Sequence, residues 1–448
     1  MLPRRRAPFS SLVIRQLSKR TERRGSSLAS IYFATAEQLR VEAASDDNLD
    51  AALQCYRKVL QFAPRSKVGL RARARERLLL MLLQRANVRE KSHADEIAVN
   101  EIRRHMKLGG FVCHLSSAVL CYGNTRNATQ FLPPPPATAQ ALDGVLPADM
   151  LAALQRAFSP NSPFWHEHGY ECGKSPFFSY IHALDQPPRI GFDYVLAKLL
   201  HHACEHFPRA RAARFAEWWA HCRPHGIGHQ LHFDSDDEGE GGIRNPLVSS
   251  ALYLTSGVGG PTLVTEQKAG QALAQRGWSV MPEENRYLLF DGKLLHGVVP
   301  GCGAVGREGG SSGRRRITLM VAFWQTIETR PSAVPSSARP FPYDYTADAK
   351  SLGSCDAAVA ASWAPLFDWP TSRPESEAPV RAVESPLYPV QPVWELTPAS
   401  RHNGCSHDDS LSKTGQSLPN IRDRDHGASW LYSARTMPSY EQCFQGLC

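Results

Sequence analysis

The sequence has little of what a membrane or secreted protein needs. Its 448 residues contain no uncharged apolar run near the roughly 18 residues that span a bilayer, and the N-terminus lacks the apolar segment of a secretory signal. No Cys-x-x-Cys pair occurs among the 11 cysteines, and an odd, scattered set is typical of reduced thiols rather than of a disulfide framework or structural zinc site. No membrane association is expected, and a reducing compartment fits.

Acidic residues are scarce at the N-terminus, which decides how the net charge of +8 is interpreted. The first thirty residues hold eight Arg and Lys against Glu22 alone, so they carry nearly all of the excess charge. The rest of the chain is close to neutral and lacks the broad positive surface that binds phosphate groups, so no nucleic-acid partner is expected. This Arg- and Ser-rich segment is typical of a transit peptide for a mitochondrion or plastid, with a basic tail on a cytoplasmic protein as the alternative.

The sequence divides into four parts. Residues 1–30 form the transit-like segment, and residues 31–108 form a helical extension. Within that extension one helix has the apolar spacing of a tetratricopeptide unit: Ala52, Tyr56, Val59, Leu60 and Pro64. Because one unit is visible where about three are needed for independent stability, an extension packed on the next domain is favoured over a peptide-binding array. Residues 109–325 form a central domain, and the Pro- and Ser-rich residues 326–448 are expected to be largely irregular.

This central domain combines helices with short strands. A strand is predicted over 111–122, and helices over 147–158 and 192–206. After Arg214 the apolar period changes to two, which predicts eight short strands: 215–222, 228–233, 247–254, 262–266, 278–281, 287–290, 294–298 and 316–324. Such a series of short strands indicates a jelly roll or barrel, and the expected fold class is therefore α+β with an N-terminal helical extension.

A candidate metal site lies on two of these strands. On a strand His232 and Asp234 share one face, because residues two apart point the same way. His296, on the strand over 294–298, can supply a third ligand. Two histidines and one carboxylate occupy one face of an octahedron and leave three positions open, which is the arrangement of non-haem Fe(II) oxygenases.

The last strand carries a candidate anchor for an anion. Arg316 and Thr318 share one face of this strand, whereas the apolar residues between them face the other way. A guanidinium beside a hydroxyl suits the far carboxylate of a dicarboxylic acid, through bidentate charge-assisted hydrogen bonds.

Taken in order, these residues resemble those of the Fe(II)- and 2-oxoglutarate-dependent dioxygenases, most closely the prolyl-hydroxylase-like branch. The H-x-D at His232 and Asp234, the distal His296 and the R-x-[S/T] at Arg316 and Thr318 occur in the order of the family. The resemblance covers about 146–324. It implies a double-stranded β-helix (jelly roll) and the three metal ligands just named.

Two further elements complete the resemblance. The Tyr-Leu strand of the family resembles 251–254 here, and its Gly-Gly turn resembles 259–262. The resemblance implies that Tyr253 contacts 2-oxoglutarate together with Arg316 and Thr318, and that Thr262 is a weaker candidate for the same contact. The chain departs from the family in one interval: Arg316 follows the distal histidine by 20 residues instead of about ten, since the Gly-rich residues 301–313 intervene. Arg314 is therefore a rival for the anchor.

Other motifs with the same residue types are expected to have no role in metal binding. His93-Ala94-Asp95 is a second H-x-D, but it lies in a polar segment without a strand pattern. The histidines at 166–168 and 201–206 are interpreted as coincidences in a chain with 17 His. Asp236 and Asp237 lie just past the strand end and are interpreted as loop acids.

The resemblance implies an oxidoreductase that couples oxidation of 2-oxoglutarate to succinate and CO₂ with hydroxylation of a substrate. The substrate that it implies is a peptidyl residue. The implied cofactors are Fe(II) and the co-substrate 2-oxoglutarate, with ascorbate as an optional addition. The partners are O₂ and an unidentified protein or small molecule. The alternatives are a hydroxylase of a small metabolite and a non-catalytic scaffold that binds partners through its helices.

Overall fold

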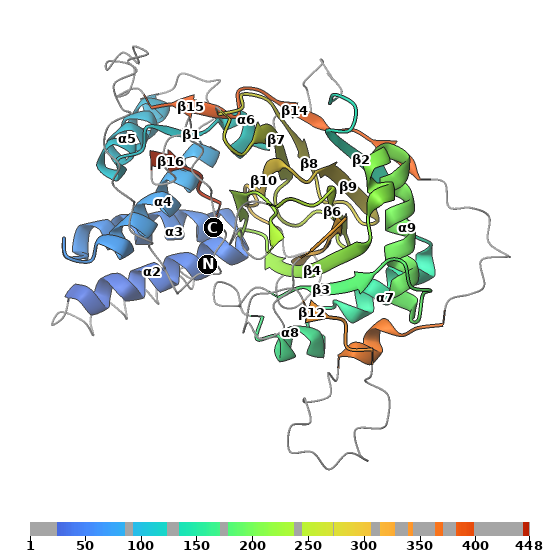
Figure 1. Cartoon of the computed structure of the whole chain (residues 1–448). Helices are drawn as coiled ribbons and strands as arrows, with labels where there is room; N and C mark the ends of the chain where they lie inside the picture. Colours follow the sequence, from blue (N-terminus) through green and yellow to red (C-terminus); the bar gives the residue numbers. More distant parts are fainter. Residues whose placement is uncertain are drawn as a thin grey trace, which may run out of the picture.

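The computed structural model describes the chain over eleven segments: 25–85, 93–122, 134–170, 178–236, 244–271, 273–305, 314–327, 339–343, 363–370, 382–397 and 442–447. The fold is mixed α+β, with sheets at the centre and helices around them (Figure 1). Across the described segments no helix is both long and apolar enough to cross a membrane.

Three sheets are formed by the described residues, and their strands are antiparallel apart from the pairs β12–β3 and β1–β16. The largest sheet has the order β12 (Arg339–Pro340), β3 (Tyr180–Ala183), β4 (Phe215–Pro224), β11 (Arg315–Trp324), β6 (Val248–Tyr253), β9 (Arg286–Asp291), β2 (Ala139–Asp143) and β13 (Val383–Ser385). The second has the order β14 (Tyr388–Val390), β8 (Gly277–Val280), β7 (Thr262–Lys268), β10 (Leu294–Val298) and β5 (His229–His232). The smallest consists of β15 (Trp394–Leu396), β1 (Cys113–Leu115) and β16 (Cys443–Phe444).

The eight strands predicted after Arg214 are confirmed as β4 to β11. The strand predicted over 111–122 is wrong for most of its length, because β1 covers only three residues and is followed by the short helix α6 (Ser117–Leu120). The hydroxyl of Ser116 accepts a hydrogen bond from the Val119 amide (3.3 Å) and so caps that helix. Strands β2 and β3 were not predicted, since each is short and lies outside the run of regular alternation.

One face of the eight-stranded sheet is covered by helices. Figure 1 shows α7 (Ala148–Ala157) and α9 (Gly191–His206) beside this sheet, with α8 (Pro163–Glu167) near them. Every second residue of β11 from Ile317 to Phe323 is buried in the core that these helices share with the sheet. Alternation therefore turns Arg316 and Thr318 to the opposite face, which looks toward the five-stranded sheet.

The helical extension covers the other sheet. It comprises α2 (Gly25–Glu42), α3 (Asp46–Phe62), α4 (Val68–Arg85) and α5 (His93–Gly109), which lie together on one side of the sheets in Figure 1. One apolar core joins these helices to residues of the five-stranded sheet and its loops: Leu231, Phe233, Leu263, Leu295 and Val299. The facing sides of both sheets, which carry apolar residues such as Tyr253 and Val264 as well as polar ones, are thus enclosed between two apolar layers.

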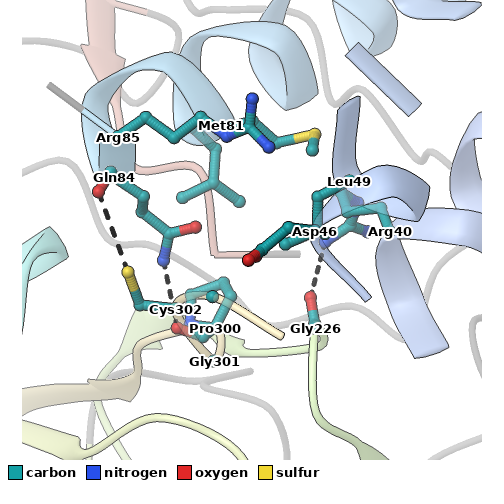
Figure 2. Close-up of a pocket in the computed structure, with 12 residues that line it drawn as sticks. Arg40, Asp46, Leu49, Met81, Gln84, Arg85, Gly226, Pro300, Gly301 and Cys302 are labelled. Atoms are coloured by element: carbon teal, nitrogen blue, oxygen red, sulfur yellow. Dashed lines mark hydrogen bonds between the residues drawn. The ribbon is translucent and has the colours of Figure 1, made fainter. Parts of the chain in front are cut away.

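Polar contacts also join the helical extension to the sheet loops, around a cavity of about 140 Å³ (Figure 2). Arg40 donates to the carbonyl of Gly226 (2.5 Å), and Gln84 donates to that of Pro300 (3.2 Å). The Gly226 amide in turn donates to the carbonyl of Val41 (3.0 Å). Gly226 lies in the turn between β4 and β5, so the helices hold the turn that leads into the strand of His232.

Pieces of the range 326–448, expected to be largely irregular, belong to the fold where they are described. The short helix η5 (Ala364–Phe367) places Phe367 in the core beneath α9. Strand β14 extends the five-stranded sheet, and β15 and β16 flank β1. These pieces pack on elements that precede them by more than a hundred residues.

Candidate metal centre

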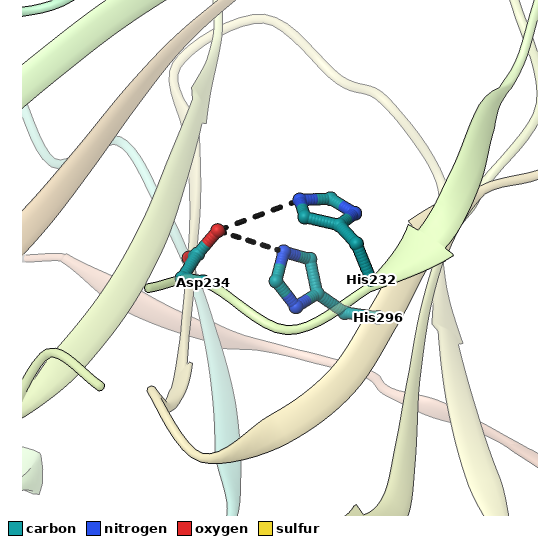
Figure 3. A group of neighbouring side chains, drawn as sticks. All are labelled: His232, Asp234 and His296. Atoms are coloured by element: carbon teal, nitrogen blue, oxygen red, sulfur yellow. Dashed lines mark ion pairs between the residues drawn. The ribbon is translucent and has the colours of Figure 1, made fainter. Parts of the chain in front are cut away.

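Three side chains meet between the two large sheets. His232 and His296 are directly opposite each other in the antiparallel pair β5–β10. Asp234 lies two residues past the end of β5, and one of its oxygens is 3.4 Å from His232 Nε2 and 3.6 Å from His296 Nε2 (Figure 3). The three ligand atoms lie within 4.8 Å of one another, and this is the metal-competent group of three or more such residues in the described part of the chain.

Backbone contacts fix the tautomer of both histidines. Nδ1 of His232 donates to the carbonyl of Gln230 (3.0 Å), and Nδ1 of His296 donates to that of Leu294 (3.0 Å). A carbonyl oxygen can only accept, so each Nδ1 carries a proton, and it is Nε2 that presents the lone pair of the neutral ring. Ordered contacts of this kind orient histidines that bind metals.

The carboxylate of Asp234 is held by the facing sheet. Its second oxygen accepts a hydrogen bond from the hydroxyl of Ser249 on β6 (2.6 Å). Burial favours the protonated acid, but the two histidines and Ser249 outweigh it and hold the pKa of Asp234 well below its usual range. Burial lowers the pKa of His296 to about 4. At neutral pH the group therefore consists of a carboxylate and at least one neutral imidazole.

These three residues fit a divalent metal ion. Two imidazole lone pairs converge on a carboxylate oxygen, and Nε2 of buried His296 has no hydrogen-bond partner among the described residues. Three electron-rich atoms in one place repel one another unless a cation lies between them. The donor set of two nitrogens and one carboxylate is that of facial-triad iron sites.

Arg316 is a buried cation at the same face of the eight-stranded sheet. It is 3% exposed, and its Nη1 donates a hydrogen bond to the carbonyl of Gly260 (3.3 Å). Its Nε has no partner among the described residues, and neither has the hydroxyl of buried Thr318. Burial lowers the pKa of Arg316 to about 10. A buried guanidinium without an acidic partner is costly, so the arrangement suits an anionic ligand.

Tyr253 and Thr262 lie next to this cation. The phenol of Tyr253 donates to the hydroxyl of Thr262 (2.7 Å), and Tyr253 is directly opposite Thr318 in the pair β6–β11. Gly259 has a positive φ of 80°, and a Cβ there would lie 2.8 Å from Cδ of Arg316. Glycine at this position therefore leaves the space that the arginine occupies.

The rival candidates are placed elsewhere or have other partners. Arg314 is exposed and precedes β11, whereas Arg316 is buried within it. Both carboxylate oxygens of Asp236 accept from Nε of Arg244 (3.0 and 2.9 Å). His93 begins helix α5, remote in sequence from the strands of the triad. Asp237 lies outside the described residues.

The two other histidine clusters have structural contacts. Nε2 of His168 forms a hydrogen bond with the Tyr180 hydroxyl (2.7 Å), and its ring packs against that of Phe164. His201 and His202 lie on α9 beside Glu205. Ordinary packing and helix-surface contacts account for both clusters.

Sequence reasoning missed three residues of the site. Ser249 could have been found, because it shares the alternation of Tyr253 on β6 and so faces the same interior. Tyr122, just after α6, does not lie on an alternating strand, so no pattern in the sequence points to it. Its hydroxyl accepts from the Cys302 amide (2.8 Å), and burial raises its pKa to about 12 while the charge of nearby Arg316 opposes the rise.

His229 is the third missed residue, and a β-bulge places it. His296 pairs with His232 and Val298 pairs with His229, so three steps along β5 oppose two along β10. Strict alternation would put His229 on the face opposite His232, but the extra residue brings their ring centroids to 4.8 Å. Bulges commonly re-aim side chains beside functional sites.

No family model matches the sequence, and no curated protein matches it. Among solved structures, a prolyl-4-hydroxylase from Pseudomonas putida is 19% identical, with a TM-score of 0.27, over 42% of this chain and 94% of its own. HygX from Streptomyces hygroscopicus, with nickel and 2-oxoglutarate bound, is 13% identical, with a TM-score of 0.27, over 44% and 86%. The non-heme alpha ketoglutarate dependent carbocyclase SnoK is 11% identical, with a TM-score of 0.28, over 42% and 79%. Likenesses this low carry no argument for function, which rests on the site.

Proposed function

We propose that the protein is a non-haem Fe(II)- and 2-oxoglutarate-dependent dioxygenase with a jelly-roll catalytic domain. The observation that carries the proposal is a pair of uncompensated groups enclosed by the same two sheets. Nε2 of His296, in the triad with His232 and Asp234, and Nε of buried Arg316 have no hydrogen-bond partner among the described residues. A metal ion and a dicarboxylate together would satisfy both.

Each residue has a role that its contacts support. His232, Asp234 and His296 would hold Fe(II), which supplies the activation of O₂ that amino-acid side chains lack. Arg316 and Thr318 would bind the far carboxylate of 2-oxoglutarate, with Tyr253 and Thr262 beside them. His232 is the more accessible imidazole, with a side chain 16% exposed against 3% for His296, so substrate would approach on its side.

The proposed reaction is hydroxylation, with succinate and CO₂ as co-products. Purified protein supplied with Fe(II) and 2-oxoglutarate should form succinate, and Asp234→Ala should form none. If the unmodified protein retains Fe(II) but forms no succinate, the proposal is contradicted. Omitting ascorbate from the same assay tests whether it is needed.

The proposed substrate is a peptidyl residue, as in the prolyl-hydroxylase-like branch that the motifs resemble. Incubation with a cell lysate, followed by a search of peptides for the mass of one added oxygen, tests this class. Oxygen added to a small metabolite instead would move the protein to the alternative class. An inert scaffold is disfavoured, because such a protein gains nothing from burying an arginine whose Nε has no hydrogen-bond partner among the described residues, as Arg316 does.

We propose import into a mitochondrion or plastid from the composition of residues 1–30, most of which lie outside the described residues. A fusion of residues 1–45 to a fluorescent protein should reach an organelle. The matched control replaces Arg4, Arg5 and Arg6 with glutamine and should be imported less well. A cytosolic signal from the unmodified fusion would contradict import.

A further inference from the structure

Two cysteines that are 330 positions apart in the sequence lie side by side in the fold. Cys113 on β1 and Cys443 on β16 are opposite each other in the parallel pair of these strands, and their sulfur atoms are 3.3 Å apart. Both are free thiols, 0% and 4% exposed. Adjacent strands hold opposite Cα atoms about 5 Å apart, which is within the range that a disulfide requires.

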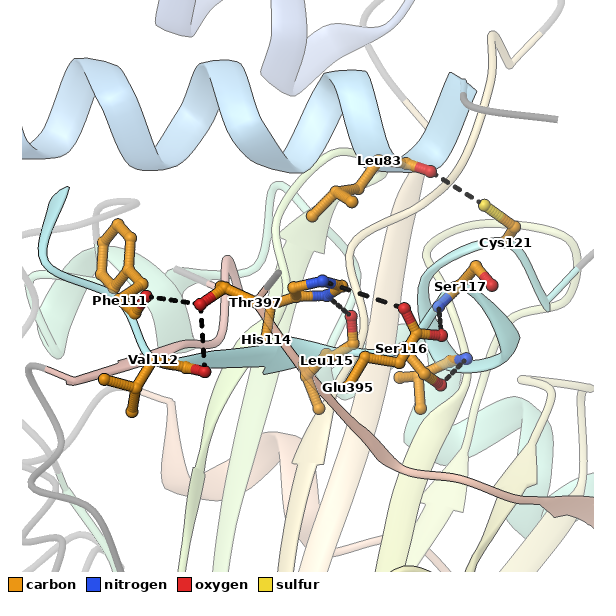
Figure 4. Close-up of polar contacts among 11 residues, drawn as sticks. Leu83, Phe111, Val112, His114, Leu115, Ser116, Ser117, Cys121, Glu395 and Thr397 are labelled. Atoms are coloured by element: carbon orange, nitrogen blue, oxygen red, sulfur yellow. Dashed lines mark hydrogen bonds and ion pairs between the residues drawn. The ribbon is translucent and has the colours of Figure 1, made fainter. Parts of the chain in front are cut away.

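Strand β1, which carries Cys113, is held in place by contacts with neighbouring elements. Figure 4 shows the contacts on its other side, where the Thr397 hydroxyl donates to the carbonyls of Phe111 and Val112 (both 3.3 Å). His114 Nε2 lies 3.8 Å from the carboxylate of Glu395. Cys121, just after α6, donates to the Leu83 carbonyl of helix α4 (3.1 Å). The segment that contains β1 is therefore tied to both β15 and the helical extension.

The segment 442–447 extends from β1 to β5, the strand that contains His232. The side-chain oxygen of Gln445, a residue 2% exposed, accepts from the amide of Leu231 on β5 (3.1 Å). Leu231 is the neighbour of His232. Close packing continues at Gly228, where a Cβ would lie 2.6 Å from the Leu447 carbonyl oxygen. Segment 442–447 thus covers the edge strand of the five-stranded sheet.

We propose that Cys113 and Cys443 form a reversible disulfide that locks segment 442–447 onto β5. Formation of the disulfide does not depend on the proposed function. The effect of the disulfide on iron retention does rest on the proposed function. With both thiols reduced, the segment is held by backbone and apolar contacts and can open locally. With the disulfide formed, β16 cannot leave β1, so the segment opens less often and the Gln445–Leu231 contact is held in place more of the time.

The oxidant that the switch requires is a small-molecule disulfide such as oxidised glutathione. The Cys443 thiolate attacks one sulfur of the oxidant, which gives a mixed disulfide and releases one glutathione thiolate. Cys113 sulfur then attacks Cys443 sulfur, the second glutathione leaves as its thiol, and the protein has lost two electrons and two protons. Cys443 is the expected nucleophile, because the hydrogen bond from Cys113 lowers the pKa of Cys443 and raises that of Cys113.

The first experiment equilibrates the full-length protein in glutathione buffers of increasing oxidised fraction, then alkylates it and digests it without reductant. Mass spectrometry should find one cross-linked peptide pair that contains Cys113 and Cys443, and the pair should disappear in the reduced buffer. Cys443→Ser should abolish the cross-link, and Cys113→Ala serves if that variant does not fold. Cys55→Ser, at a buried cysteine in the same apolar core, should leave it unchanged.

The second experiment measures amide hydrogen exchange of the metal-free protein in both redox states. The amide of Leu231 should exchange roughly 10-fold more slowly in the oxidised state, because the lock suppresses local opening. Gln445→Leu should keep the cross-link but lose the slowing. A chelator should also remove Fe(II) more slowly from the oxidised protein. If the protein holds no Fe(II), the proposed function fails, and the exchange experiment still tests the lock.

Three results would overturn the inference. The first is recovery of both cysteines as free thiols at the most oxidising ratio. The second is a glutathione adduct on Cys443 that never resolves to Cys113. The third is a cross-link that leaves exchange at Leu231 unchanged, which would separate the disulfide from the strand of His232.

Discussion

Two arginines in this molecule are equally buried and have opposite surroundings. Arg40 in the helical extension and Arg316 in the sheet interior are each 3% exposed. Nε of Arg40 donates to Tyr56, Nη1 to Gly226 and Nη2 to Glu37. Arg316 donates to the carbonyl of Gly260, and its Nε has no partner among the described residues.

The difference separates a structural cation from one prepared for a ligand. Burial opposes the charge of Arg40, but Tyr56 and Glu37 outweigh it and raise the pKa of Arg40, whereas burial lowers that of Arg316 to about 10. The acids of the two regions differ in the same way. Burial disfavours the charged form of both Glu37 and Glu217. For Glu37 the nearby arginines outweigh burial and lower its pKa. For Glu217 on β4, burial and the charge of Asp234 raise the pKa to about 7. Charges in the helical extension compensate one another, whereas Arg316 and Glu217 form no ion pair within the part of the chain that the structure describes.

The largest effect is expected at the triad itself. Asp234→Ala should abolish both Fe(II) binding and 2-oxoglutarate turnover, because two neutral imidazoles hold a hard divalent ion poorly. Titration of the metal-free protein with Fe(II) under anaerobic conditions measures the first, and succinate formation the second. His93→Ala, in an H-x-D outside the strands, should leave both intact. Equal losses in the two variants would contradict the assignment of the triad.

Removing the compensated cation should cost stability. Arg40→Met leaves Glu37 without its closest cation and Gly226 without a donor, so the free energy of unfolding should fall by about 3 kcal/mol. Denaturant unfolding of the metal-free protein measures the change. The KM for 2-oxoglutarate of the folded fraction should stay the same. A raised KM without a loss of stability would mean that Arg40 belongs to the ligand site.

Removing the uncompensated cation should have the opposite outcome. Loss of a bidentate contact to a buried carboxylate costs about 2 to 5 kcal/mol, so Arg316→Ala should raise the KM for 2-oxoglutarate roughly 30-fold or more. Fe(II) binding should be nearly unchanged. Arg316→Met should not lower the stability of the metal-free protein, since a buried charge without an acidic partner is lost. Arg314→Ala should have little effect, and a larger effect there than at Arg316 would place the anchor two residues earlier.

The smallest effect concerns pH and the two glutamates. Glu217 keeps its proton up to a pKa of about 7 in the folded protein, against a usual 4.5, so its contribution to stability is complete below pH 4.5 and is lost as the pH rises through 7. Glu217→Gln should remove this loss and stabilise the metal-free protein at pH 8 by about 2 to 3 kcal/mol. Glu37 has a lowered pKa, so Glu37→Gln should instead destabilise the protein at pH 8. If the stability of both variants changed with pH in the same way, the two glutamates would not differ as proposed.

Much of the strand pattern could be predicted from the sequence, because alternation is a local property. The eight strands from β4 to β11 follow from apolar residues spaced two apart. The same parity puts Arg316 and Thr318 opposite the apolar residues of β11, and the core positions of Ile317 and Leu319 agree with it. Strand β1 was predicted too long, because apolar residues after Ser116 read equally well as strand or helix.

What the sequence determined by itself is which side chains share a face: His232 with Asp234, and Arg316 with Thr318. Only the tertiary structure decided which faces meet, since that depends on contacts between distant segments whose closure leaves no local pattern. The bulge that turns His229 beside His232 exists only in the pairing of β5 with β10. The contact of Gln445 with Leu231 joins residues 214 positions apart. Hydrogen-bond partners, too, are set by the folded chain, and they alone distinguish Arg40 from the equally buried Arg316.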